Sequence, residues 1–162
     1  GTIAGGNYGI YLSGSTISGG LTNSGTISGG TNAIYVDSSA SLDSIVIAGN
    51  NTAKFIGAVE APNTPVTVAS GATYTMDNAQ QFTVSGFTNA GTLKIGAGNT
   101  GSITGDFTNT GTFSPVITDD THYGKLLVSG TATLGGVLFA DAATVVQGAL
   151  TDGGRLAGQR LL

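Results

Sequence analysis

The sequence predicts an all-β protein built as a β-solenoid, in which short parallel strands stack coil upon coil. Three observations predict this fold: repeats with a period of about 20–24 residues, regularly spaced glycines, and short segments rich in β-branched residues. No segment shows a helical period of 3.6 residues with capping residues. In such a parallel β-helix each strand pairs with its equivalent one coil further on, at a spacing of about 4.8 Å.

The composition fits one well-cored domain of 162 residues. Charged residues make up only 9 % of the chain, against roughly 25 % in an ordinary soluble domain. Hydrophobic residues nevertheless make up 40 %, which indicates a buried core rather than disorder. The five Lys and Arg residues are scattered, so we expect no nucleic-acid surface. No apolar run approaches the roughly 20 residues of a membrane-spanning helix, so the chain itself is not expected to span a membrane.

The first quarter of the chain carries the longer form of the repeat. The block GTIAGG at residues 1–6 reappears as GTISGG at residues 25–30. At the same offset Tyr11 aligns with Tyr35, so we expect the two rings to stack as a ladder on successive coils. An exposed aromatic track for glycans, which would include Tyr8, is the alternative interpretation.

Residues 57–65 are expected to leave the coil as a protruding loop. Pro62 and Pro65 interrupt the strand pattern beside Glu60, the only glutamate of the chain. Loops carried by a rigid scaffold often bind partners. The candidate recognition loop therefore contains Glu60, Pro62, Asn63 and Pro65.

The middle of the chain repeats the pattern Asn-x-Gly-Thr-apolar, which begins at residues 23, 89 and 109. The last two copies represent the shorter form of the repeat, and each follows the dipeptide Phe-Thr. Equivalent residues of successive coils lie one above the other, so amide and aromatic side chains should form stacking ladders. The ladder residues are Phe87, Asn89 and Leu93 in one coil and Phe107, Asn109 and Phe113 in the next. We assign residues 1–114 to the coils.

From Tyr123 the repeat gives way to a run in which every second residue is apolar or small. The run comprises Leu126, Val128, Gly130, Ala132, Leu134, Gly136 and Leu138. A period of two that continues across two consecutive glycines predicts two strands joined by a turn or a bulge. We expect residues 115–143 to form a β-hairpin cap on the solenoid, and residues 144–162 to supply a last strand and a tail or linker.

The C-terminal pattern resembles the autochaperone region at the end of bacterial autotransporter passengers. The resemblance rests on the motif Tyr-x-x-Leu-x-Val-x-Gly-x-Ala-x-Leu-x-Gly-x-Leu, which starts at Tyr123, and on the Asn-x-Gly-Thr-apolar and Gly-Thr-Ile-Ser-Gly-Gly repeats. Together these cover residues 1–140. The resemblance implies a right-handed parallel β-helix that is exported through the periplasm and the outer membrane to the bacterial cell surface.

The same resemblance implies a function and partners. The residues of the C-terminal motif would nucleate and cap the folding of the β-helix during export, and so support a surface passenger of virulence or adhesin type. The partners would be the chain's own upstream coils and a downstream outer-membrane β-barrel.

Asp119, Asp120 and His122 form the one dense ionisable cluster of the sequence. Adjacent residues of a strand point to opposite faces, so the two carboxylates should not converge as an acid–base pair. The composition around them predicts a solvated turn. We therefore expect a chain that is not an enzyme and has no catalytic residue, cofactor or metal site.

Two alternative functions remain open at this point. In the first, the chain would be an adhesion or self-association module that binds a host surface or another copy through residues 57–65 or its long uncharged faces. In the second, it would be a fragment of a glycan-active β-helix enzyme that uses Asp119 and Asp120.

Overall fold

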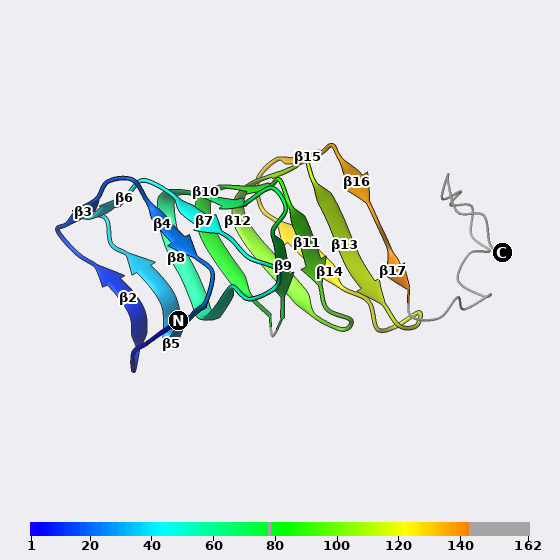
Figure 1. The fold of residues 1–162 in the computed structure, drawn as a ribbon, viewed down its shortest axis with the longest axis horizontal. Coiled ribbons are helices and arrows are strands. Elements are labelled where there is room, and N and C mark those ends of the chain that lie inside the picture. Colours follow the sequence, from blue (N-terminus) through cyan, green and yellow to red (C-terminus); the bar gives the residue numbers. More distant parts are fainter. Residues whose placement is uncertain (78, 143–162) are drawn as a thin grey trace.

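A computed structural model describes residues 1–77 and 79–142 and shows a parallel β-solenoid of about six turns. The coils follow one another along a common axis from the N-terminal strands to β16 and β17 (Figure 1). Within the described part of the chain there is no helix, and hence no helix long and apolar enough to cross a membrane. The predicted all-β parallel β-helix is confirmed.

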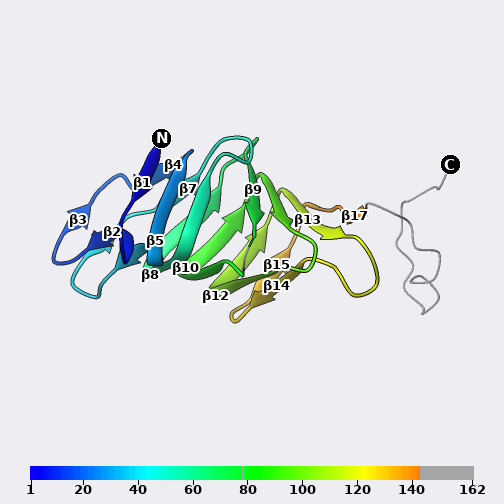
Figure 2. The same ribbon diagram turned by 90° about the horizontal axis from the view of Figure 1, so that it is seen from below.

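Ten strands form the largest sheet, and its main path consists of β1 (Thr2–Ala4), β5 (Thr26–Val36), β8 (Lys54–Val68), β10 (Gln81–Asn89), β12 (Thr100–Asn109) and β14 (Lys125–Val128). The other four strands of this sheet are β2 (Tyr8–Leu12), β4 (Leu21–Asn23), β7 (Ile45–Ile47) and β15 (Ala132–Leu134). Figure 2 shows β5, β8, β10 and β12 side by side along the axis.

A second sheet has five strands, β9 (Thr73–Met76), β11 (Thr92–Ile95), β13 (Thr112–Ile117), β16 (Val137–Leu138) and β17 (Asp141–Ala142). The short strands β3 (Thr16–Ile17) and β6 (Ser41–Leu42) pair with each other. The long strands β5, β8, β10 and β12 each contain a register shift and pair with the neighbouring strand on both sides of it.

The length of a coil follows from the residues that face each other on neighbouring strands. One step along the axis leads from Phe87 to Phe107, and the next, slightly longer step leads from Phe107 to Ala132. The longest step joins Thr26 to Lys54. This step exceeds the predicted period. Two register shifts in the pairing of β5 with β8 absorb the extra residues, so the step from Tyr35 to Glu60 is shorter again.

The core is a continuous apolar column whose composition changes along the axis. On the early coils it consists of aliphatic side chains, which include Ile27, Ile34, Ile45 and Ile47. On the later coils it becomes aromatic, with Phe55, Tyr74, Phe82, Phe87 and Phe107 all buried. Neighbouring rings of this aromatic part lie 5.1 to 6.2 Å apart between centroids, and most pairs meet edge to face.

Residues 57–65 do not form the protruding loop that the prolines suggested. Strand β8 runs through them and pairs with β10 on both sides of the prolines. Between Ala61 and Pro65, three residues of β8 face a single residue of β10, so the insertion is reduced to a bulge. Thr64 in this bulge is buried, and its hydroxyl donates a hydrogen bond of 3.0 Å to the carbonyl of Leu42, which holds the segment in the coil.

The hairpin cap expected at residues 115–143 is not found either. Strands β14 and β15 both pair in parallel with β12, and β16 and β17 pair in parallel with β13. Among the described residues no antiparallel ladder joins these four strands, so they continue the solenoid as a further coil. The physical reason is that the free edges of β12 and β13 offer backbone donors and acceptors that parallel pairing satisfies. The strand and tail expected at residues 144–162 lie outside the described residues.

Candidate functional site

The candidate folding site is the terminal coil, which we define as residues 125–142. Leu126 and Val128 are partly buried against the end of the core. Leu134 and Leu138, which alternate with them in the sequence, are 73 % and 65 % exposed. Leu138 lies opposite Phe113 and thus occupies an inward position of its coil. The alternation identified the inward face, but among the described residues no later coil covers it.

Two glycines form corners of the terminal coil. Gly136 has a φ of +67°, and a Cβ atom there would overlap the carbonyl oxygen of Gly111. A Cβ atom at Gly130 would overlap the carbonyl oxygen of Gly105 on the preceding coil. Both positions therefore require glycine, because the corner backbone approaches the previous coil closely.

Tyr123 lies where the chain enters the terminal coil. A single antiparallel bridge joins Tyr123 to Ile117 across the intervening turn. The ammonium group of Lys125 lies 4.7 Å from the centroid of the Tyr123 ring, within the range of a cation–π contact. Tyr123 thus closes the turn rather than the end of the core.

Two contacts that sequence analysis missed fasten the terminal coil to earlier coils. Lys94 Nζ lies 3.2 Å from Asp141 Oδ2, although the two residues are far apart in the sequence. The backbone amide of Thr131 donates a hydrogen bond of 2.8 Å to the carboxylate of Asp106 on the preceding coil. No motif links these partners, so no sequence pattern could have identified them.

The aromatic ladder residues lie in register on successive strands. Phe87 faces Phe107 with ring centroids 6.2 Å apart, and Phe107 in turn lies 6.2 Å from Phe113. Leu93 faces Phe113 across the pairing of β11 with β13. These side chains form the C-terminal part of the core.

The two asparagines form a buried amide ladder. The Nδ2 atom of Asn89 donates to Oδ1 of Asn109 at 2.7 Å and to the carbonyl of Thr112 at 2.8 Å. The Nδ2 atom of Asn109 donates to the carbonyl of Gly135 at 2.6 Å, at the start of the next coil. The ladder therefore links the coil of β10 to the terminal coil through side-chain hydrogen bonds.

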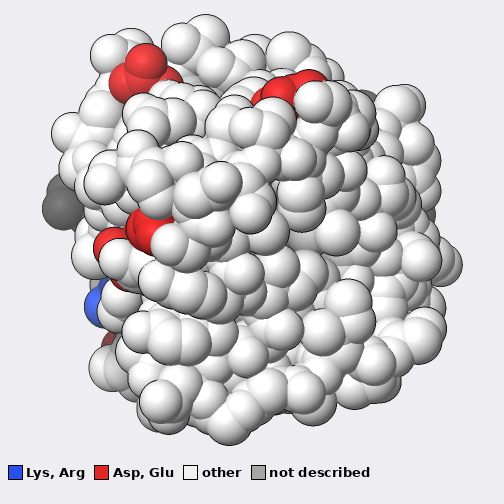
Figure 3. Space-filling model, turned by 90° about the vertical axis from the view of Figure 1, so that its left-hand side faces the viewer, with Lys and Arg blue, Asp and Glu red and all other residues white. Residues whose placement is uncertain are grey.

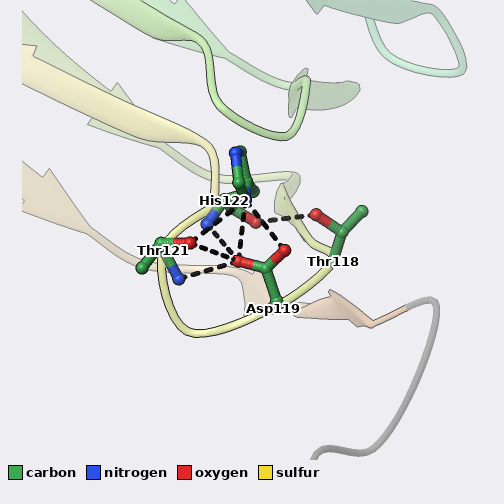
Figure 4. A network of polar contacts seen from close by, with 4 residues as sticks. All are labelled: Thr118, Asp119, Thr121 and His122. Carbon is green, nitrogen blue, oxygen red and sulfur yellow. Dashed lines mark hydrogen bonds and ion pairs between the residues drawn. The ribbon is translucent and has the colours of Figure 1, made fainter.

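Asp119 organises an exposed turn, which Figure 4 shows together with its partners. Its carboxylate accepts hydrogen bonds from the hydroxyl of Thr121 at 2.7 Å and from the backbone amide of His122 at 2.7 Å. Ring atom Nδ1 of His122 lies 2.8 Å from both carboxylate oxygens. The bonds from the Thr121 hydroxyl and amide hold the pKa of Asp119 below its usual value, because they favour the charged carboxylate.

These contacts define a structural role for the turn at residues 118–122. The carboxylate is saturated by groups of its own turn, and Asp120 is exposed beside it. Nowhere in residues 1–77 and 79–142 do three or more His, Cys, Asp or Glu side chains gather closely enough to hold a metal ion. The cluster therefore matches an Asx-type turn, in which an aspartate caps the amides that follow it.

A cavity of about 450 Å³ lies between the beginning of β8 and the residues that follow β9. Phe55 and Tyr74 contribute aromatic lining, and the charged lining residues are Lys54 and Asp77. Burial raises the pKa of Tyr74, and the Asp77 carboxylate raises it further. Among the described lining residues, the ionisable side chains are Lys54, Tyr74 and Asp77.

The predicted recognition residues of β8 are separated by the bulge. Pro62, Asn63 and Pro65 are exposed on its outside. Glu60 lies before the bulge, opposite Tyr35 of β5, and it accepts a hydrogen bond of 3.3 Å from the side-chain amide of Asn32. Glu60 thus lies in a strand beside the tyrosines and not in a loop, and no local sequence pattern signals this position.

No protein-family model, no curated protein and no solved structure matches this chain. The class of protein that the fold defines is the parallel β-solenoid. The fold class alone does not specify a function, so the function is inferred from the described residues.

Proposed function

We propose that this chain is the folding-template part of an exported β-solenoid of autotransporter type, and that its later coils fold first. The observation that carries the proposal is the position of the aromatic core. The four largest fully buried side chains are Tyr74, Phe82, Phe87 and Phe107, and they lie on β9, β10 and β12, after the early coils. Each buried aromatic ring removes roughly 150–250 Å² from water, so these coils have the strongest drive to fold.

The solenoid architecture explains why one stable region would suffice. A coil cannot bury its core face alone, so the first coils to form carry the largest cost in chain entropy. Each coil that folds afterwards adds to an existing strand edge, so it buries apolar surface as soon as it pairs. Coils that add from the aromatic region towards the N-terminus would give export a direction.

The terminal coil supports this role in a manner that differs from a hairpin cap. Leu126 faces Gly101 and Val128 faces Ile103, so both side chains cover the end of the aromatic core. The coil thereby protects the template while its own outer face stays open. The partners in this proposal are the upstream coils and a downstream outer-membrane β-barrel, and the location is the bacterial cell surface.

The test compares two conservative substitutions at fully buried sites, Phe107→Leu in the aromatic region and Ile34→Val on an early coil. If the later coils nucleate folding, Phe107→Leu slows refolding, whereas Ile34→Val mainly accelerates unfolding. Stopped-flow refolding of the full chain measures both rates. The same pair, placed upstream of an outer-membrane barrel, should differ in surface display, with Phe107→Leu showing the greater loss.

The opposite kinetic pattern would overturn the proposal. If Ile34→Val slowed refolding and Phe107→Leu left the refolding rate unchanged, the early coils would be the nucleus. Normal display of Phe107→Leu together with a clear loss of display for Ile34→Val would lead to the same conclusion.

A further inference from the structure

Three tyrosines and one carboxylate gather on the outside of the early coils. Tyr8 and Tyr11 project from β2, and Tyr35 projects from β5. Their ring centroids lie 5.2 Å (Tyr8–Tyr11), 5.5 Å (Tyr8–Tyr35) and 5.6 Å (Tyr11–Tyr35) apart. Tyr11 faces Tyr35 and Tyr35 faces Glu60, so these three residues form one row across three neighbouring strands, and Tyr8, which faces Asn32, lies beside this row. We call these four residues the tyrosine–glutamate cluster.

The cluster is accessible at its upstream end. Tyr8 is 39 % and Tyr11 is 53 % exposed, so both rings remain accessible to solvent although they pack against each other. If the tyrosines served only to stack on one another, they would not require the Glu60 carboxylate next to Tyr35. The exposed rings beside Glu60 therefore need a second explanation.

The electrostatic environment of the cluster is negative. The carboxylate of Glu60 is the main cause that raises the pKa of Tyr35, and burial adds to it. Asn32 donates to Glu60 Oε2 and so helps to fix the position of the carboxylate. Residues 1–53 contain no Lys or Arg. The end of the molecule that carries the first coils accordingly shows several acidic patches and little basic surface (Figure 3).

We propose that the tyrosine–glutamate cluster binds an organic cation of the quaternary ammonium class, such as a choline group. The faces of aromatic rings attract cations that lie within about 6 Å of the ring centroid. The three centroids are so close together that one cation can lie within this distance of all of them, and the ring of Tyr8 is tilted by 34° and 49° against the stacked rings of Tyr11 and Tyr35. The carboxylate of Glu60 supplies the opposite charge, which three neutral rings lack.

The same chain contains a built-in comparison for this geometry. Lys125 lies over the ring of Tyr123, and this is the one cation–π contact found in the described part of the chain. The ring of Tyr123 is therefore already in contact with the ammonium group of Lys125, whereas the three clustered tyrosines contact no Lys or Arg among the described residues. This inference is independent of the proposed folding role.

The experiment titrates the full chain with choline chloride and follows the tyrosine ring signals by NMR. We expect saturable shifts for the rings of the cluster in the millimolar range, and no comparable shift for Tyr123. Dimethylbutanol, in which carbon replaces the nitrogen of choline, is the uncharged control probe. Glu60→Gln should weaken choline binding about threefold and leave the binding of dimethylbutanol unchanged, because only the charged probe depends on the carboxylate. Tyr11→Leu, at an exposed site, should abolish the choline shifts.

Three outcomes would overturn the proposal. Equal binding of choline and dimethylbutanol would make the cluster a plain apolar patch. Larger shifts with cellobiose than with choline would make it a glycan surface. Absence of any saturable shift would leave the tyrosines a purely structural ladder. Thermal unfolding of Glu60→Gln and Tyr11→Leu checks that both variants stay folded at the temperature of the titration.

Discussion

At the scale of single residues, the column that contains Asn89 and Asn109 shows how one position can serve two purposes. Its other members are Asn23, Ile47, Val68 and Leu134, so half of its six positions hold apolar side chains and half hold asparagine. Asparagine occurs where the corner leaves backbone carbonyls that need a donor. An aliphatic residue would fill the space, but it would leave these carbonyls unsatisfied.

We predict that Asn109→Ala lowers the free energy of unfolding by about 1–3 kcal/mol, because it removes the side-chain donor to the carbonyl of Gly135 and one of the two acceptors of the Asn89 amide. Asn63→Ala is the matched control at an exposed site and should change stability by less than about 0.5 kcal/mol. Urea unfolding of both variants measures the difference. Equal effects of the two substitutions would contradict the amide ladder as a stabilising feature.

Asp119 gives a prediction for the pH dependence of stability. Its folded-state pKa is lowered by hydrogen bonds from Thr121, so the charged carboxylate stabilises the fold above the unfolded pKa of about 3.9. This contribution is lost as the pH falls through the folded-state pKa. We therefore expect Asp119→Asn to lower Tm at pH 7, and the difference from the unmodified chain to shrink as the pH falls below about 4. A constant difference in Tm across this range would rule out the carboxylate charge as its cause.

At the scale of elements, the terminal coil shows why an alternating pattern does not specify strand direction. Every second residue from Leu126 to Leu138 is apolar or small, which identifies one face of a strand but not its neighbour. A hairpin and a parallel coil both place these residues on one face. The available edges of β12 and β13 select the parallel arrangement.

We predict that Leu126→Asp and Leu134→Asp differ strongly, although both residues belong to the same alternating run. Leu126 is partly buried against the core, so a carboxylate there should cost about 2 kcal/mol of stability. Leu134 is 73 % exposed, so the same change should cost less than about 0.5 kcal/mol. Chemical denaturation of both variants provides the measurement. A loss at position 134 equal to that at position 126 would show that Leu134 is covered in solution.

At the scale of the whole molecule, the solenoid is uneven along its axis. All three residues of β1 are exposed, and the early coils depend on aliphatic packing. The coils of β10 and β12 combine fully buried rings with the amide ladder. In a solenoid each coil depends mainly on its neighbours, so such differences translate into local differences in stability.

We predict that backbone amides exchange with solvent in a graded manner along the axis. Amides of β2 should exchange through local opening, whereas those of β10 and β12 should require nearly global unfolding. Native-state hydrogen exchange on the full chain measures this, and Phe107→Leu should accelerate exchange in β10 and β12. Identical opening free energies for β2 and β12 would mean that the solenoid unfolds as a single cooperative unit.

The sequence by itself determined the stacked parallel architecture, because a repeated pattern of glycines and β-branched residues places equivalent residues above one another in every coil. For the same reason it identified the residues of the aromatic and amide ladders, whose partners lie one period away. Only the tertiary structure decided that β8 continues through two prolines, that the last strands form a coil, and that Glu60 lies beside the tyrosines. These features depend on which strand edge is free and on how a bulge absorbs extra residues, and neither depends on the local pattern of the residues involved.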